Sequence, residues 1–170
     1  AASGKSHYAQ RLAEDRPGLL LYVATAQAGD EEMAQRIERH RKARGERWQT
    51  LEVNEDLAGQ LADVSGSYAV VLIDCITLWL TNLLLSHEES PEKVWAAVDD
   101  FVASLDRIEA KVIMVSNEVG LSLVPEYPLG RVFRDLAGKV NQRLAERADR
   151  VCLVAAGLPL ELKPGHPHTH

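Results

Sequence analysis

Three short apolar runs, each ending in polar residues, constrain the fold of this chain more than any other feature. They are LLLYVAT at 19–25, AVVLIDC at 69–75 and VIMVSN at 112–117. A continuous apolar run of this length is typical of a strand buried on both faces, as in a parallel sheet covered by helices. The segments 48–53 and 151–155 are also expected strands, and residues 160–162 are expected to add a short edge strand.

Segments with helical patterns lie between these strands. We expect helices over 6–13, 30–43, 56–64, 77–85, 91–108 and 129–148; the last has a buried stripe of Leu129, Val132, Phe133, Leu136, Val140 and Leu144. Alternation of strands and helices predicts an α/β fold with a mostly parallel sheet flanked by helices. Ligands of such sheets bind at the carboxyl ends of the strands. The residues that follow the runs are therefore candidates for ligand contact.

Length and composition fit one globular domain. The chain has 170 residues, of which 46% are hydrophobic and 26% charged, so a disordered chain is excluded. We expect a single catalytic domain over 1–163 and a mobile His/Pro tail over 164–170. No apolar run approaches the ~20 residues of a membrane span. Cys75 and Cys152 lie within apolar runs, which predicts buried free thiols in a cytoplasmic protein.

Positive charge is concentrated in one short window. The chain has a net charge of −6, which predicts no nucleic-acid partner. The window 36–47 holds six basic residues and two acidic ones, so it carries +4 and the rest of the chain −10. An acidic protein repels polyanions unless it carries a local basic patch of this kind, so the concentration of charge needs a reason. Its basic residues are Arg36, Arg39, Arg41, Lys42, Arg44 and Arg47.

Residues 3–6 read Ser-Gly-Lys-Ser, the second half of the phosphate-binding loop G-x-x-x-x-G-K-[ST]. In such a loop the backbone N–H groups around Gly4 cradle phosphate oxygens, Lys5 reaches the β- and γ-phosphates, and the Ser6 hydroxyl binds Mg²⁺. The alternative is a flexible basic segment without a ligand. We expect that a strand and the first glycine of the loop precede Ala1 in a longer chain.

Asp74 ends the run VVLID. A carboxylate at the tip of a buried strand suits the Walker-B role, in which it holds Mg²⁺ directly or through water. The alternative is an aspartate that caps the next helix, a position for which Thr77 competes. Asn117 and Glu118 follow the run VIMVS and suit substrate contact, or else they form a plain connection.

His40 lies one helical turn beyond Ile37 in the middle of the basic window. Positive neighbours disfavour protonation of an imidazole and so favour its neutral, nucleophilic form. They would also hold a polyanionic substrate beside it. The alternative is a structural histidine on a solvated basic face.

Seven stretches, in order and over nearly the whole chain, resemble one enzyme family. They are SGKS at 3–6, YVATAQ at 22–27, DEEMAQRIERHR at 30–41, WQTLE at 48–52, LIDCITLWLTNLL at 72–84, VSNEVGLSLVPE at 115–126 and GRVFRDLAGKVNQRLA at 130–145. The family is the bifunctional adenosylcobinamide kinase / adenosylcobinamide-phosphate guanylyltransferase of cobalamin biosynthesis. The resemblance implies a P-loop NTPase of RecA-like architecture that assembles as a homotrimer.

The resemblance also implies the chemistry and its residues. A nucleoside triphosphate, ATP or GTP, phosphorylates adenosylcobinamide; GMP from GTP then passes to that phosphate through a histidine, which matches His40 in the I-x-x-H-R motif. His40 and Lys5 are the implied catalytic residues, and Ser6 and Asp74 the implied Mg²⁺ ligands. The implied nucleotide contacts are Gly4, Lys5, Ser6, Thr25, Ala26, Gln27, Arg41, Lys42, Ala43, Arg44, Glu52 and Asp74.

Two other hypotheses stay open from the residues alone. One is a P-loop kinase for another small molecule, which cobinamide would not stimulate. The other is a non-enzymatic GTP-binding module, which would retain GTP without an acceptor. The choice between ATP and GTP as phosphoryl donor, the kinase general base and the corrinoid contacts have no diagnostic residue in the sequence.

Overall fold

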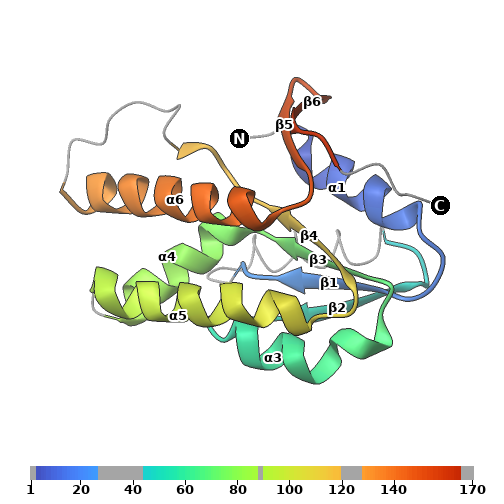
Figure 1. Ribbon diagram of the computed structural model, residues 1–170, viewed down its shortest axis with the longest axis horizontal. Coiled ribbons are helices and arrows are strands. Elements are labelled where there is room, and N and C mark those ends of the chain that lie inside the picture. Colours follow the sequence, from blue (N-terminus) through green and yellow to red (C-terminus); the bar gives the residue numbers. More distant parts are fainter. Residues whose placement is uncertain (1–2, 27–43, 88–89, 120–127, 166–170) are drawn as a thin grey trace, which may run out of the picture.

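The computed structural model describes residues 3–26, 44–87, 90–119 and 128–165. Figure 1 shows a sheet with helices on both of its faces and a separate two-stranded ribbon. The elements are α1 (Lys5–Glu14), β1 (Leu20–Ala24), β2 (Trp48–Glu52), α3 (Leu57–Val64), the 3-10 turn η1 (Ser65–Ser67), β3 (Val70–Asp74), α4 (Ile76–Ser86), α5 (Pro91–Ser104), the 3-10 turn η2 (Leu105–Arg107), β4 (Lys111–Val115), α6 (Pro128–Arg147), β5 (Val151–Ala155) and β6 (Leu158–Lys163).

The main sheet has four parallel strands in the order β2-β1-β3-β4, which confirms the predicted α/β fold. In the register, Ala24 lies beside Glu52 on one side and Asp74 on the other, and Asp74 lies beside Val115. The four strands therefore end level. All the residues that follow them are brought to one edge of the sheet.

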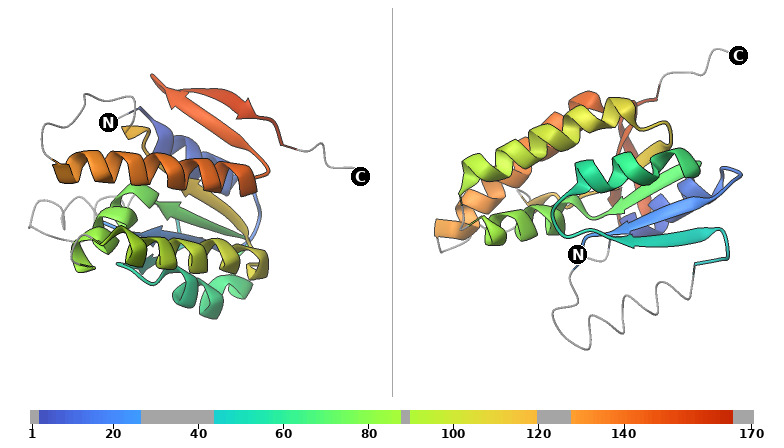
Figure 2. Two further views of the ribbon diagram at one scale, coloured as in Figure 1. Left: turned by 60° about the vertical axis from the view of Figure 1, so that its left-hand side comes forward. Right: turned by 90° about the horizontal axis from the view of Figure 1, so that it is seen from below.

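One face of the sheet carries most of the core. Leu21 and Val23 of β1 and their neighbours on β3 pack there against α3, α4, α5 and α6. Trp79 and Phe101 are the largest fully buried side chains, and their rings meet edge to face at 5.2 Å. The right-hand view of Figure 2 shows these helices over the strands.

Helix α1 covers the opposite face and runs against the direction of the strands. Ala9 clusters with Leu72 and Cys75 near the carboxyl ends of the strands, whereas Ala13 clusters with Leu20 and Val70 near their amino ends. The N-terminus of α1 consequently lies at the edge where the strands end. Residues 4–6 and Asp74 are thus brought to the same edge.

The C-terminal strands depart from the expected single sheet. β5 and β6 form their own antiparallel ribbon, joined by a turn at 156–157, and the left-hand view of Figure 2 shows it apart from the main sheet. β6 is longer than the expected 160–162, and Leu158, Leu160 and Leu162 are exposed on it.

The predicted stripe of α6 was wrong at Val132, which is 40% exposed, because the packing of α6 on the core is closest over Leu136–Leu144. Cys75 is buried as predicted, whereas Cys152 is only half-buried, and both thiols are free. The expected helix at 30–43 lies outside the described residues.

Arg47, from the basic window, is used to hold the fold. Its guanidinium donates to the carbonyl oxygens of Glu14, Arg16 and Gly18 at 3.0, 2.7 and 3.2 Å. These carbonyls lie at and just beyond the C-terminus of α1, where backbone acceptors lack helical partners and the helix dipole favours a cation. Arg47 therefore links the start of β2 to the end of α1.

We expect Arg47→Ala to lower the free energy of unfolding by about 1–2 kcal/mol, because a charged hydrogen bond is worth ~1.5–3 kcal/mol and exposure to water weakens it. Urea unfolding followed by circular dichroism measures the change. Arg107→Ala, which removes the same charge from an exposed position in η2, is the control. An Arg47→Ala midpoint equal to that of the control would show that these bonds add nothing in solution.

Candidate active site

Gly4 precedes α1 in a conformation that suits a phosphate loop. Its φ of +88° is in the left-handed region, and a Cβ added there would lie 3.1 Å from the Gly157 Cα. The Gly157 N–H donates to the Ser3 carbonyl oxygen at 2.8 Å, so the turn of the β5–β6 ribbon contacts this loop. Because glycine has no side chain to cap the first helical turn, the N–H groups there are suited to bind an anion.

Lys5 and Ser6 begin α1 at the edge where β3 ends. Burial raises the pKa of the Cys75 thiol and the Asp74 charge raises it further, whereas the Lys5 ammonium lowers it. The Lys5 charge therefore lies within electrostatic range of the residue that follows Asp74.

The Asp74 carboxylate is held by a tyrosine of the neighbouring strand. The Tyr22 hydroxyl donates to Asp74 Oδ2 at 3.0 Å. Burial and the Asp74 charge raise the pKa of that hydroxyl, so it remains a donor. The alternative in which Asp74 caps the next helix was wrong, because Cys75 is the residue immediately before α4. Thr77, the other residue considered for the cap, lies inside α4, and its hydroxyl accepts from the Asn117 N–H at 2.9 Å.

Thr25 ties the tips of the central strands together. Its hydroxyl donates to the Cys75 carbonyl oxygen at 2.7 Å and accepts from the Cys75 N–H at 2.8 Å, and it is fully buried. The Asn82 amide of α4 donates to the carbonyl oxygens of Thr25 and Asn54 at 2.8 and 3.1 Å. Thr25 therefore shapes this edge through its side chain, and Asn82 extends the support to the residues after β2.

Of the other described candidates, Glu52 and Arg44 lie on the α1 face of the sheet. Glu52 and Asp74 flank Ala24 on the same face, roughly 10 Å apart, because neighbouring strands are about 4.8 Å apart. Ala26 follows Thr25 and is half-buried, and the Arg44 guanidinium lies over the Tyr22 ring. The candidates Gln27, His40, Arg41, Lys42 and Ala43 lie outside the described residues.

A second polar network adjoins this edge at the end of β4. The Ser116 hydroxyl donates to Asn141 Oδ1 of α6 at 2.7 Å. The Asn141 amide in turn donates to the Asn117 carbonyl oxygen at 3.2 Å and to Glu118 Oε1 at 3.0 Å. The segment after β4 is thus held by α6.

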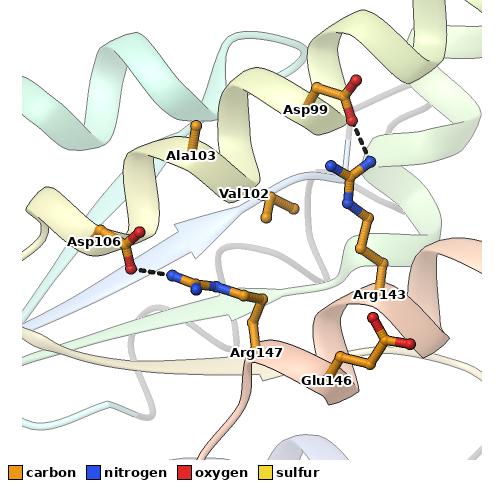
Figure 3. A pocket seen from close by; sticks show the side chains of 7 residues that line it. All are labelled: Asp99, Val102, Ala103, Asp106, Arg143, Glu146 and Arg147. Atoms are coloured by element: carbon orange, nitrogen blue, oxygen red, sulfur yellow. Dashed lines mark hydrogen bonds and ion pairs between the residues drawn. The ribbon is translucent and has the colours of Figure 1, made fainter.

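A cavity of about 300 Å³ lies elsewhere, between α5 and α6, on the face of the sheet opposite α1. Figure 3 shows Arg143 and Arg147 of α6 reaching Asp99 of α5 and Asp106 of η2. These ion pairs join α6 to α5 and to η2 across the hollow. The cavity contains none of the candidate residues, so we do not assign the reaction to it.

The donor set at the sheet edge fits Mg²⁺ carried with a nucleotide. Across the described residues, no group of three or more His, Cys, Asp or Glu side chains gathers to hold a metal ion. Mg²⁺ is usually bound by one or two carboxylates together with substrate phosphates and water. The Asp74 carboxylate and the Ser6 hydroxyl supply oxygen ligands of this kind.

No helix in the described ranges combines the length and apolarity needed to cross a membrane.

Comparison with known proteins decides the family. The sequence model of the family described as cobinamide kinase / cobinamide phosphate guanyltransferase matches residues 1–162. The chain belongs to this family. It is 44% identical to the bifunctional adenosylcobalamin biosynthesis protein CobP of Pseudomonas aeruginosa, over 98% of this chain and 95% of that protein. It is 41% and 44% identical to the CobU proteins of Escherichia coli and Salmonella typhimurium, each over 96% of both chains.

Membership of the cobinamide kinase / cobinamide phosphate guanyltransferase family confirms that the chain is an enzyme of cobalamin biosynthesis with kinase and guanylyltransferase activities. The P-loop NTPase fold expected of it agrees with the parallel sheet. The hypotheses of a kinase for another substrate and of a non-enzymatic module were therefore wrong.

Sequence reasoning gave no role to three residues that organise the site: Tyr22, Asn82 and Asn141. Of the three, only Tyr22 is marked in the sequence by a pattern that indicates its role. A tyrosine inside an otherwise aliphatic buried strand needs a partner for its hydroxyl. The register that brings Asp74 to it was not available from the sequence.

Proposed function

We propose that this enzyme uses one nucleotide site, at the carboxyl edge of the sheet, for two successive reactions. In the first, the hydroxyl of adenosylcobinamide attacks the γ-phosphorus of ATP or GTP, and a nucleoside diphosphate leaves. In the second, GMP from GTP is transferred through His40 to the new phosphate. One observation carries the proposal. The N-terminus of α1, with Lys5, lies at the same edge of the sheet as Asp74, the last residue of β3.

The chain's own residues have separate roles in phosphate handling. The N–H groups after Gly4 bind phosphate oxygens, and Lys5 neutralises charge that develops as the leaving group departs. Arg44, Glu52 and the backbone at 25–27 contact the nucleotide, together with Arg41, Lys42 and Ala43. Mg²⁺, held through Ser6 and Asp74, would polarise the phosphoryl oxygens when bound.

His40 divides guanylyl transfer into two displacements. Its imidazole nitrogen forms a bond to the α-phosphorus of GTP, the bond from that phosphorus to the β-phosphate oxygen breaks, and pyrophosphate leaves with the electron pair. A phosphate oxygen of adenosylcobinamide phosphate then attacks the same phosphorus, and the nitrogen–phosphorus bond breaks to return the free imidazole. The product is adenosylcobinamide-GDP.

The remaining expectations concern the whole protein. We place both reactions in one domain over 1–163, in the cytoplasm, without a nucleic-acid partner. A homotrimer follows from the family resemblance and is measured by light scattering coupled to gel filtration.

GTP labelled at different phosphates tests the two-step route. We expect label from the α-phosphate to remain on the protein, labile in acid and stable in base as a phosphoramidate is, and to be chased off by adenosylcobinamide phosphate. Label from the γ-phosphate should reach adenosylcobinamide without remaining on the protein. Peptide mapping that finds GMP on a residue other than His40, or no adduct, would overturn the route.

A further inference from the structure

Tyr22 lies at the centre of a cluster on the α1 face of the sheet. Its hydroxyl donates to Asp74 Oδ2 at 3.0 Å, while its ring lies 3.5 Å below the Arg44 guanidinium carbon. The Tyr22 and Trp48 rings form an edge-to-face pair, with centroids 6.3 Å apart and planes at 74°. One side chain therefore contacts both an anionic and a cationic candidate of the nucleotide site.

The register explains why Tyr22 reaches Asp74. Tyr22 is paired with Leu72 on β3, and Asp74 is two residues further along the same face. A diagonal neighbour at this offset is within reach of an aromatic side chain. The contact thus follows from the strand pairing itself and does not depend on a loop.

Arg44 depends on the same ring. It is 9% exposed, and its Nε and Nη1 atoms are buried without a hydrogen-bond partner. Among the described residues, Nη2 has one long bond, 3.5 Å to the Thr50 hydroxyl. Burial of a guanidinium with so few hydrogen bonds costs free energy, and stacking of its charge on the face of an aromatic ring offsets part of that cost. The Tyr22 ring is accordingly the main support of Arg44 in the described chain.

We propose that Tyr22 is a positioning residue that orients the Asp74 carboxylate through its hydroxyl and seats the Arg44 guanidinium through its ring. The two parts of the side chain serve two parts of the nucleotide site. This inference rests on the proposed function, which assigns Asp74 to Mg²⁺ and Arg44 to the nucleotide. Partners that orient a metal ligand typically change metal affinity 10- to 100-fold when they are removed.

Two substitutions separate the hydroxyl from the ring. Tyr22→Phe removes only the donor to Asp74. We expect about 10-fold weaker retention of Mn²⁺ in the complex of the protein with the α,β-methylene analogue of GTP, which cannot pass GMP to His40, measured by electron paramagnetic resonance of free Mn²⁺. The GTP affinity of this variant in EDTA should stay within about 2-fold of the parent, because the ring still supports Arg44. Tyr22→Leu should lose both Mn²⁺ retention and GTP affinity in EDTA.

A matched control is available in Tyr68→Phe. The Tyr68 hydroxyl donates to Gln49 Oε1 at 2.5 Å, before the start of β3 and so at the far end of the strand from Asp74. This variant loses a comparable hydrogen bond and should bind Mn²⁺ and GTP as the parent does. Thermal unfolding of every variant sets a temperature at which all are folded.

Asp74→Asn distinguishes failure of this inference from failure of the proposed site. If Asp74→Asn lowers Mn²⁺ retention and Tyr22→Phe does not, Tyr22 does not orient the carboxylate. If Asp74→Asn itself leaves Mn²⁺ retention unchanged, the assigned metal role of Asp74 is wrong and the inference is overturned with it. If Tyr22→Phe and Tyr22→Leu reduce GTP affinity in EDTA equally, the ring has no separate role.

Discussion

Replacing His40 by alanine should abolish covalent attachment of GMP to the protein and lower guanylyl transfer by roughly 10³-fold or more, the scale seen when a covalent nucleophile is removed. Phosphorylation of adenosylcobinamide should continue, because the phosphoryl group passes directly from the nucleotide to the hydroxyl. The two activities would thereby be separated by one side chain. Intact-protein mass spectrometry after incubation with GTP measures the adduct, and steady-state assays measure each activity.

His87→Ala is the control for this experiment. His87 follows the last turn of α4 and is half-buried, so the variant removes an imidazole from the far end of the helix whose first residue, Ile76, follows Cys75. It should keep both activities and the adduct. A folded His40→Ala variant that lost both activities equally would show that His40 supports nucleotide binding or the fold rather than carrying GMP.

Replacing Lys5 by alanine should have the opposite pattern and lower both activities together, each by about 10²–10³-fold in kcat/KM. The reason is that both reactions expel a charged phosphate group from the same loop, and Lys5 supplies the charge that stabilises it. The adduct should still form on His40 but far more slowly. Rates of adenosylcobinamide phosphorylation and of adduct formation, measured separately, test this.

Lys93→Ala removes the same charge from an exposed position of α5 and should leave both rates unchanged. A Lys5→Ala variant that lost only one activity would contradict a shared phosphate site. It would indicate that the two reactions use different nucleotide sites.

The layered fold could be predicted from the sequence because the apolar runs are short, continuous and separated by helical patterns. The run at 69–75 became β3, and the residues after the runs came to one edge, as parallel strands require. The separate β5–β6 ribbon could not be predicted, since a five-residue apolar segment is compatible with either a central or a detached strand.

The candidate site was only partly predictable, because a local sequence pattern does not contain the contacts between elements that are far apart in the chain. Charge and position in the sequence indicated Lys5 and Asp74 as candidates, and both lie at the expected edge of the sheet. The role of Tyr22 depends on strand register, and that of Arg47 on where α1 ends, neither of which is encoded locally. Both residues were therefore placed by tertiary contacts that a sequence pattern does not contain.

The strand order has a consequence for synthesis of the chain. β1 is an interior strand, and its partners begin 28 residues later at Trp48 and 50 residues later at Val70. During translation the segment Leu20–Ala24 therefore leaves the ribosome with both of its hydrogen-bonding edges open. The edge that faces β2 can close only after Glu52 has emerged, and the edge that faces β3 only after Asp74 has emerged. Non-local parallel pairing of this kind is slow, and open apolar edges favour association between chains. The nascent chain is accordingly most prone to aggregate between the emergence of Ala24 and the emergence of Asp74.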